Sequence, residues 1–212
     1  VWMAMKGKAE WALNRYSVSY AACLLRPLRF YSPCMSFLPP AWQRRLERHP
    51  VLIPALLLAV WLAFTAGWRS LMLPDEGRYA SIALTMAQNG NWGVPLLNHL
   101  PFFHKPILFY WITGGALKLF GATVWAARAA SLVGAWLAGM GLYLFVRRHG
   151  NPLQAQWAGL ALAVLAGMPF FFVGAQFANT DMLVAGMISA TILAAAHAVL
   201  QAAQGLPHLR WV

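Results

Sequence analysis

Residues 124–146 read VWAARAASLVGAWLAGMGLYLFV, and this stretch decides the kind of fold that the chain has. It carries no charged residue except Arg128, and it is rich in Ala, Leu, Val and Gly. A helix rises about 1.5 Å per residue, so a run of this length covers roughly 30 Å, the thickness of the hydrocarbon core of a bilayer. The stretch therefore predicts a transmembrane helix, with Arg128 near its outer end snorkelling to the interface.

Three further apolar runs surround this one: residues 51–68, about 153–174 and about 182–203. The first is barely long enough to cross a bilayer, and Pro169 is expected to kink the second. The whole chain is 60% hydrophobic and 10% charged, whereas soluble domains are about 25% charged. We therefore predict an all-α integral membrane protein with about four transmembrane helices.

Residues 106–120 are apolar but too short for a clear span, and the distribution of charge decides their placement. The basic residues gather beside two runs: Arg44, Arg45 and Arg48 before the first, and Arg147 and Arg148 after the second. Positive residues favour the cytoplasmic side, and a crossing by residues 106–120 would put the second group outside. These residues are therefore predicted to be interfacial. The resulting four-span arrangement also places Asp75 and Asp181 on the same outer face.

The net charge of +11 lies mainly beside the membrane runs, which indicates a cytoplasmic anchor and argues against a nucleic-acid partner. We predict a basic cytoplasmic segment over residues 1–50 and the transmembrane part of one domain over residues 51–212. Residues 1–34 have two open interpretations: an amphipathic arm, or a partly spurious stretch before a natural start at Met35. The two cysteines, Cys23 and Cys34, show neither a disulfide framework nor metal-ligand spacing.

The long outer loop, residues 69–123, is predicted to contain two juxtamembrane helices. Pro74-Asp75 is a good helix start, with Asp75 as the cap. Apolar residues then recur at helical spacing and form one face: Tyr79, Ile82, Ala83 and Met86. Asn89-Gly90 is a good stop. A second helix is expected to begin with Pro106 at its first position and to carry aromatic residues at headgroup level.

Acids are rare in this chain, so each one in the outer loops calls for an explanation. The five acids are Glu10, Glu47, Asp75, Glu76 and Asp181. Asp75 and Glu76 lie close to Arg78 in sequence and share a loop with Lys105. Carboxylates beside cations at one membrane face suit group transfer from a lipid-linked phosphate, because carboxylates accept protons and cations stabilise a leaving phosphate. The simpler alternative, that both acidic sites only cap helices, stays open.

Four motifs follow one another in the chain: PDEGRYA at 74–80, NWGVP at 91–95, HKPILFYW at 104–111 and LFG at 119–121. Their ordered series resembles the N-terminal region of bacterial membrane glycosyltransferases, in the aminoarabinose transferase and protein O-mannosyltransferase-related family with the GT-C fold. The likeness runs from about residue 51 to residue 203. It is greater to the aminoarabinose branch, which modifies lipid A, than to the mannosyl branch.

The resemblance implies inverting transfer of a sugar from a polyprenyl-phosphate carrier, such as undecaprenyl phosphate, on the periplasmic face of the bacterial inner membrane. A lipid A-like molecule, a glycan or a protein would be the acceptor. Asp75 and Asp181 match acidic residues of the first and second outer loops, and we expect them to be catalytic. We expect four residues to bind the substrate or the carrier phosphate: Glu76, Arg78, Tyr79 and Lys105.

Two departures from the family pattern bear on these expectations. Aminoarabinose transferases often have Glu before the Lys-Pro pair, where this chain has His104. Histidine also binds metals, so His104 is a candidate ligand for a possible divalent metal. Family members have around a dozen spans and a C-terminal periplasmic domain, so we expect these 212 residues to be inactive alone. The alternative function is a non-catalytic transporter subunit or assembly scaffold, which would place its key polar residues within spans.

Overall fold

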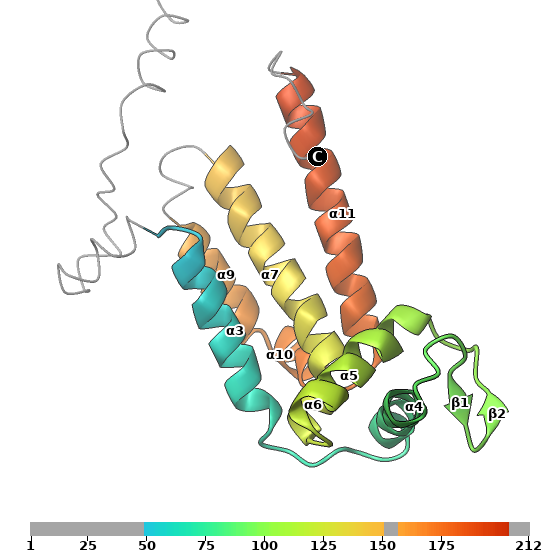
Figure 1. The fold of residues 1–212 in the computed structure, drawn as a ribbon. Coiled ribbons are helices and arrows are strands. Elements are labelled where there is room, and N and C mark those ends of the chain that lie inside the picture. The colour runs from blue at the N-terminus through green and yellow to red at the C-terminus, as the bar shows by residue number, and fades with distance from the viewer. Residues whose placement is uncertain (1–48, 151–156, 204–212) are drawn as a thin grey trace, which may run out of the picture. The chain divides into compact units, whose positions relative to one another are not determined.

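The structure is a computed structural model that describes residues 49–150 and 157–203. The predicted N-terminal segment, residues 1–50, lies outside the described residues except for its last two positions. The described chain is mainly helical, with one small two-stranded sheet (Figure 1). Its elements are α3 (Leu52–Ala66), α4 (Asp75–Asn89), β1 (Leu96–Leu97), β2 (Leu100–Pro101), α5 (Ile107–Phe120), α6 (Val124–Ala127), α7 (Ala129–His149), α9 (Ala158–Gly167), α10 (Pro169–Ala175) and α11 (Thr180–Ala203).

Within the described ranges, two helices are long and apolar enough to cross a membrane, α7 and α11. The pair α9 and α10 makes a third if it counts as one span, although it bends by 71° at the break. Pro169 occupies the first turn of α10 after an extended Met168, and the proline ring is incompatible with a continuous helix. The kink predicted at Pro169 is therefore confirmed. α3 and α5 are apolar but shorter.

The predicted span over residues 124–146 is interrupted at its outer end. Arg128 separates α6 from α7 with φ −93° and ψ 0°, and its backbone N–H donates to Trp125 O at 3.2 Å. The long helix therefore begins at Ala129. This break turns the Arg128 side chain into the protein, where it is fully buried, so the prediction that it snorkels is wrong.

α7 is the central helix of the described chain, since it contacts α3, α9 and α11 along its length (Figure 1). Its closest approach is to α11, at Gly134 and Gly186, where a Cβ on either glycine would overlap backbone atoms of the other helix. A second glycine, Gly139, faces Leu58 of α3 and Leu162 of α9. Small residues let helices meet this closely in lipid, where van der Waals contact replaces the hydrophobic effect as the driving force.

The helices α4 and α5 pack against each other and lie across one end of the α3, α7 and α11 bundle (Figure 1). The predicted apolar face of α4 is buried at each of its positions: Tyr79, Ile82, Ala83 and Met86. The stop at Asn89-Gly90 is also confirmed, because Gly90 has a left-handed φ of 70° that glycine adopts without strain. α5 begins at Ile107, one residue later than predicted.

The start of α4 differs from the prediction that Asp75 caps it. Pro74 precedes the helix with near-helical angles, φ −88° and ψ −21°, and no side chain caps the end there. Asp75 is the first helical residue, so its side chain is displaced from the capping position. Glu76 instead closes the turn: its N–H donates to Met72 O at 3.1 Å, and its carboxylate accepts from Met72 N–H at 2.8 Å. This reciprocal pair resembles a capping box.

Candidate active site

Glu76 is fully enclosed at the end of the bundle that α4 and α5 cover, with 0% of its surface exposed. Oε1 accepts hydrogen bonds from Arg128 Nε at 3.0 Å and from Ala178 N–H at 2.8 Å. Oε2 accepts from Arg69 Nη1 and Met72 N–H, both at 2.8 Å, and from Arg128 Nη2 at 3.2 Å. Both oxygens are therefore fully used by the protein itself.

The side chain of Arg128 is nearly as enclosed as the carboxylate that it meets, with 1% exposed. Besides Glu76, it donates to three backbone carbonyls between α3 and α4: Ala66 O, Arg69 O at 3.0 Å and Ser70 O at 3.2 Å. Buried charges are stable only when they are paired and their remaining hydrogen-bonding groups are satisfied. Arg128 meets both conditions, and it thereby fixes the path of the chain leaving α3.

The pKa of Glu76 reflects this environment. Burial acts to raise the pKa, but the hydrogen bonds from Arg128, from the N–H groups of Ala178 and Met72, and from Arg69 outweigh it and lower the pKa to about 2. Glu76 is therefore a permanent anion at neutral pH. Because it is enclosed, we correct the expectation that it contacts the carrier phosphate: a buried anion with saturated oxygens has no means of binding another anion.

Asp75, the neighbour of Glu76, points into an open environment. Its side chain is 53% exposed and lies 3.7 Å from Arg78 Nη1, whose side chain is 39% exposed. Two consecutive carboxylates on α4 thus have opposite surroundings, one inside the protein and one available to a ligand. An exposed ion pair of this kind contributes little to stability, about 0–1 kcal/mol, so both partners can turn toward a substrate at small cost.

Lys105 and Tyr79 are brought together from the two ends of the outer loop. The Lys105 ammonium lies 6.0 Å from the centroid of the Tyr79 ring, within the range of cation–π contact. Tyr79 in turn packs edge-on against Phe109 of α5, with ring centroids 5.9 Å apart. This stack holds Lys105 close to the turn of α4 that carries Asp75 and Arg78. Sequence analysis placed these four residues in one site, and the structure links them in two adjacent pairs.

Asp181 lies in the first turn of α11, after the loop that separates it from α10. Its carboxylate accepts from Asn179 Nδ2 at 3.1 Å and from Thr180 Oγ1 at 3.4 Å, while Asn179 Oδ1 accepts from Asp181 N–H at 3.1 Å. In the part of the chain that the structure describes, these are the hydrogen bonds of its side chain. Asp181 is exposed, and among the described residues it makes no direct hydrogen bond or ion pair with Asp75.

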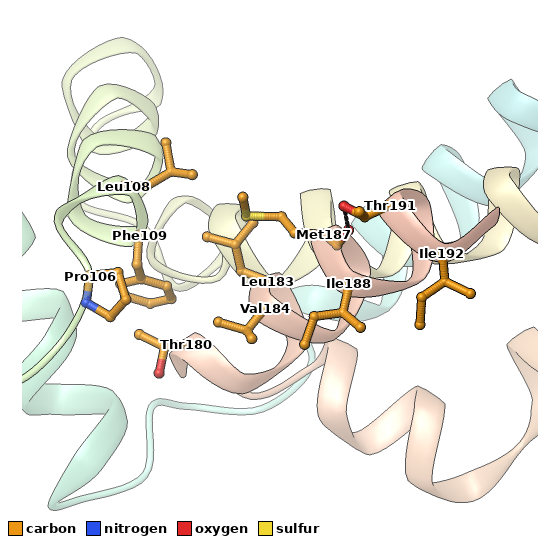
Figure 2. Close-up of a pocket in the computed structure, with 10 residues that line it drawn as sticks. All are labelled: Pro106, Leu108, Phe109, Thr180, Leu183, Val184, Met187, Ile188, Thr191 and Ile192. Carbon is orange, nitrogen blue, oxygen red and sulfur yellow. Dashed lines mark hydrogen bonds between the residues drawn. The ribbon is translucent and has the colours of Figure 1, made fainter. Parts of the chain in front are cut away.

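An apolar groove of about 580 Å³ runs along α11 beside the start of α5. Figure 2 shows Pro106, Phe109 and Thr180 at one end of the groove and Thr191 and Ile192 at the other. The walls between them are Leu183, Val184, Met187 and Ile188. Pro106 follows Lys105 in sequence and Thr180 precedes Asp181. One end of the groove therefore begins next to Lys105 and Asp181, two of the residues predicted to form the site.

The predicted metal ligand, His104, does not sit in a suitable donor set. Its ring packs on Phe102, with centroids 4.9 Å apart, and the described ranges contain no grouping of three or more His, Cys, Asp or Glu side chains that would hold a metal. Metal sites need several such ligands in one shell. These residues therefore do not form a metal site by themselves, and we assign no step to a metal.

Sequence analysis missed four members of the buried cluster around Glu76: Arg69, Arg128, Ser131 and Gln176. Arg128 carried a usable signal, because a lone arginine in an apolar run of a chain with five acids needs a buried partner. Ser131 and Gln176 carried none, since their partners are backbone carbonyls or a hydroxyl that only the fold brings near. Ser131 Oγ donates to Phe177 O at 2.7 Å and to Asn179 O at 3.0 Å.

A helical membrane protein with exposed acids and cations at one end of its bundle is the class that this fold and site define. Residues 104–207 match the family described as dolichyl-phosphate-mannose-protein mannosyltransferase. The described chain also superimposes on the crystal structure of ArnT from Cupriavidus metallidurans bound to undecaprenyl phosphate, with a TM-score of 0.62 and 29% identity over 71% of this chain and 27% of that one.

Two curated relatives place the chain more closely. It is 38% identical over 105 residues to the undecaprenyl phosphate-alpha-4-amino-4-deoxy-L-arabinose arabinosyl transferase of Shewanella sediminis, which covers 50% of this chain and 19% of the relative. It is 32% identical over 145 residues to the second such transferase of Proteus mirabilis, which covers 66% of this chain and 26% of the relative. The chain is therefore an aminoarabinose transferase-related protein with the GT-C fold. It spans about a quarter or less of the length of these relatives.

Proposed function

We propose that this chain acts in a glycosyltransferase that moves a sugar from a polyprenyl-phosphate carrier to a lipid A-like, glycan or protein acceptor. The observation that carries the proposal is the groove along α11, whose apolar walls begin beside Lys105 and Asp181. A polyprenyl phosphate has the same division, with a long apolar chain that ends in an anion. The names of the curated relatives and of the solved ArnT structure agree with this class of donor.

The cations near the groove suit the phosphate of such a donor. Lys105 is half-buried over the Tyr79 ring, and Arg78 is 39% exposed on the next turn of the same helix as Asp75. Ammonium and guanidinium groups form charge-assisted hydrogen bonds with phosphate oxygens. In the reaction, both groups would stabilise the negative charge that develops on the phosphate as the bond from the anomeric carbon to the phosphate oxygen breaks.

The acids suit the acceptor. An acceptor hydroxyl would attack the anomeric carbon from the face opposite the phosphate, and its proton would pass to the Asp75 carboxylate acting as general base. The electron pair of the broken bond leaves with the carrier phosphate, and this single displacement inverts the anomeric centre. We assign Asp181 a second role at the same face, orienting the acceptor or the sugar from the first turn of α11.

This assignment carries a topology with it. We propose that α3, α7, the α9–α10 pair and α11 cross the inner membrane of a bacterium, and that α4 and α5 lie at its periplasmic interface. The basic end of α7, which contains Arg147 and Arg148, then faces the cytoplasm, as the positive-inside rule requires. In this arrangement residues 1–50 are cytoplasmic, and residues 51–212 form the transmembrane part of one glycosyltransferase domain.

The test compares two lysines of the same loop region in the full chain. Purified protein in lipid nanodiscs is titrated with radiolabelled undecaprenyl phosphate. We expect Lys105→Ala to weaken binding about tenfold to a hundredfold, because one charge-assisted hydrogen bond contributes about 1.5–3 kcal/mol. Lys118→Ala, at the far end of α5 and exposed, serves as the matched control and should leave binding unchanged. Equal affinities for the parent chain and Lys105→Ala would contradict the role of Lys105.

Transfer is tested in the same nanodiscs with the full-length protein that contains these residues, a labelled polyprenyl-phosphate sugar and a lipid A acceptor. We expect Asp75→Asn to abolish transfer while carrier binding stays within about threefold, since the amide cannot take up the proton. Carrier binding without any transfer by the full-length protein would favour a carrier-binding scaffold over an enzyme. Transfer by Asp75→Asn at the parent rate would contradict the assignment of Asp75 as the base.

A further inference from the structure

We propose that Glu76 and Arg128 are positioning residues for the transfer reaction. Their buried ion pair fixes the first turn of α4, which carries Asp75 and Arg78, against the 176–179 loop, which precedes Asp181. The inference rests on the proposed roles of Asp75 and Asp181. It gives a cause for the arrangement of the two acids, which are far apart in sequence and do not hydrogen-bond to each other in the described part of the chain.

Glu76 holds the first turn of α4 in place. Glu76 directly follows Asp75, and its carboxylate is enclosed while that of Asp75 is 53% exposed. Glu76 is therefore an anchor placed one residue from the proposed base. Any rotation or withdrawal of the first turn that moved Asp75 would also pull Glu76 from five hydrogen bonds, and these come from Arg128, Arg69 and two backbone N–H groups.

The loop before α11, residues 176–179, is held by a hydrogen bond at each of its four residues. Glu76 accepts from Ala178 N–H at 2.8 Å, and Ser131 donates to the carbonyls of Phe177 and Asn179 on either side of it. Arg69 Nη2 donates to Gln176 O at 3.1 Å. Asp181 is three residues beyond Ala178 and hydrogen-bonds to Asn179. The Glu76 carboxylate therefore holds both the first turn of α4 and the loop that directly precedes α11 and Asp181.

Arg128 connects the first turn of α4 and the 176–179 loop, through Glu76, to the rest of the fold. It lies at the break between α6 and α7 and donates to carbonyls at the end of α3 and in the segment leading to α4. The planar guanidinium presents several N–H donors in a fixed arrangement, which an ammonium group does not. One arginine thus sets the relative placement of α3, α4 and α7 at this end of the bundle.

Fixing two acids in this way matters for rate more than for donor binding. A reacting group displaced by about 1 Å can lower the rate about a hundredfold, whereas most of the proposed carrier contacts, the groove and Lys105, lie on α11 and next to α5, and only Arg78 shares the first turn of α4. The proposal therefore predicts separate effects: loss of the ion pair should disturb the geometry between α4 and α11 and lower kcat, with little change in KM for the donor.

The geometry is measured by the distance between two spin labels in the full chain, with Cys23 and Cys34 replaced by serine. One label is placed at Ser81 of α4 and the other at Ala185 of α11, both exposed positions outside the site. We expect Glu76→Gln to shift the mean distance by about 1 Å or more and to widen the distribution. Ser131→Ala removes only the hydrogen bonds from Ser131 to the carbonyls of Phe177 and Asn179. This variant should widen the distance distribution less than Glu76→Gln does and should retain the fold.

The control is Trp136→Phe, which removes a hydrogen bond from α7 to Ala55 O of α3 away from the cluster. It tests whether any loss of stability in the bundle disturbs the label distance. A distribution unchanged in both Glu76→Gln and Ser131→Ala, or changed equally in Trp136→Phe, would overturn the proposal. This measurement needs no substrate, so its outcome is separate from that of the transfer assay.

The kinetic readout completes the test. In the transfer assay we expect Glu76→Gln to lower kcat at least tenfold and to change KM for the donor less than about threefold. Arg128→Lys, which keeps the charge and loses the planar donor set, should fall between the parent chain and Glu76→Gln. A rise in KM at constant kcat would contradict positioning. Absence of transfer by the full-length protein would count against the proposed function and leave the label distances to decide the positioning role.

Discussion

Glu76 and Arg128 meet in the interior of the protein although they are 52 positions apart, with Arg128 Nε 3.0 Å from Glu76 Oε1. The carboxylate has 0% and the guanidinium side chain 1% of its surface exposed. This pair connects the outer-loop helix α4 to the central helix α7, so the stability of the fold and the placement of the proposed site depend on the same contact.

Replacing Arg128 with methionine should destabilise the protein strongly. Met fills much of the same volume, but it leaves a buried carboxylate without its main partner and three carbonyls without a donor. Breaking a buried pair on one side costs about 3–5 kcal/mol. The free energy of unfolding, measured with SDS as denaturant in mixed micelles, should fall by roughly that amount.

The matched control for this change is Arg78→Met, which breaks the exposed pair with Asp75 on the same end of the bundle. An exposed pair contributes about 0–1 kcal/mol, so this variant should unfold nearly as the parent does. The double variant Glu76→Gln/Arg128→Met should recover part of the loss, because no uncompensated charge is then buried. Equal destabilisation by Arg78→Met and Arg128→Met would show that burial of the pair is not what matters.

The crossing of α7 and α11 should be intolerant of a methyl group. Gly134→Ala places a Cβ against the backbone of Met182 and Leu183, and backbone atoms do not move aside as a flexible side chain does. Alanine favours a helix over glycine by about 1 kcal/mol, but a steric overlap of this kind typically costs about 1–3 kcal/mol or more. We therefore expect Gly134→Ala to lower the thermal unfolding midpoint.

Gly115→Ala is the control for that prediction, since a Cβ at this position of α5 would meet nothing within 4 Å. With no overlap, only the helix preference remains, and the midpoint should stay constant or rise. A midpoint for Gly134→Ala at or above that of the parent would mean that α7 and α11 separate more easily than their close contact implies.

The local features of the fold could be predicted from the sequence, whereas its long-range contacts could not. The kink at Pro169, the stop at Gly90 and the buried face of α4 each follow from residues within a few positions. The role of Glu76 does not, because its partners come from the α3–α4 segment, the α6–α7 break and the loop before α11. Sequence alone therefore placed both Asp75 and Glu76 in contact with the substrate, one as a catalytic and one as a binding residue, and only the packing separates them.

The positions of the apolar runs predicted the helices better than the lengths of the runs did. The predicted span over residues 124–146 is divided at Arg128, because that side chain turns inward to reach Glu76. The favourable ion pair and carbonyl contacts of a buried arginine offset the loss of helical hydrogen bonds at the break. A lone arginine in an apolar run signals that it needs a buried partner, but periodicity and hydropathy do not identify that partner or the break in the helix that reaches it.

The ion pair also makes stability depend on pH in a defined direction. The pKa of Glu76 is lowered from its ordinary value of 4.5 to about 2 in the folded protein. A group with a lowered pKa contributes stability above its unfolded pKa and loses it as the pH falls toward its folded pKa. The contribution should be complete above about pH 5.5 and should disappear between about pH 4.5 and pH 2, with a total of roughly 3 kcal/mol.

Other acids titrate in the same range, so the measurement is the difference between the parent chain and Glu76→Gln at each pH. The free energy of unfolding of both proteins is measured in mixed micelles from pH 7 to pH 3. We expect the difference to be constant above about pH 5.5 and to shrink steadily below pH 4.5, because only the parent takes up a proton at Glu76 when it unfolds. A difference that stays constant down to pH 3 would mean that Glu76 keeps an ordinary pKa, and the charge-assisted contacts with Arg128 and Arg69 would then not form.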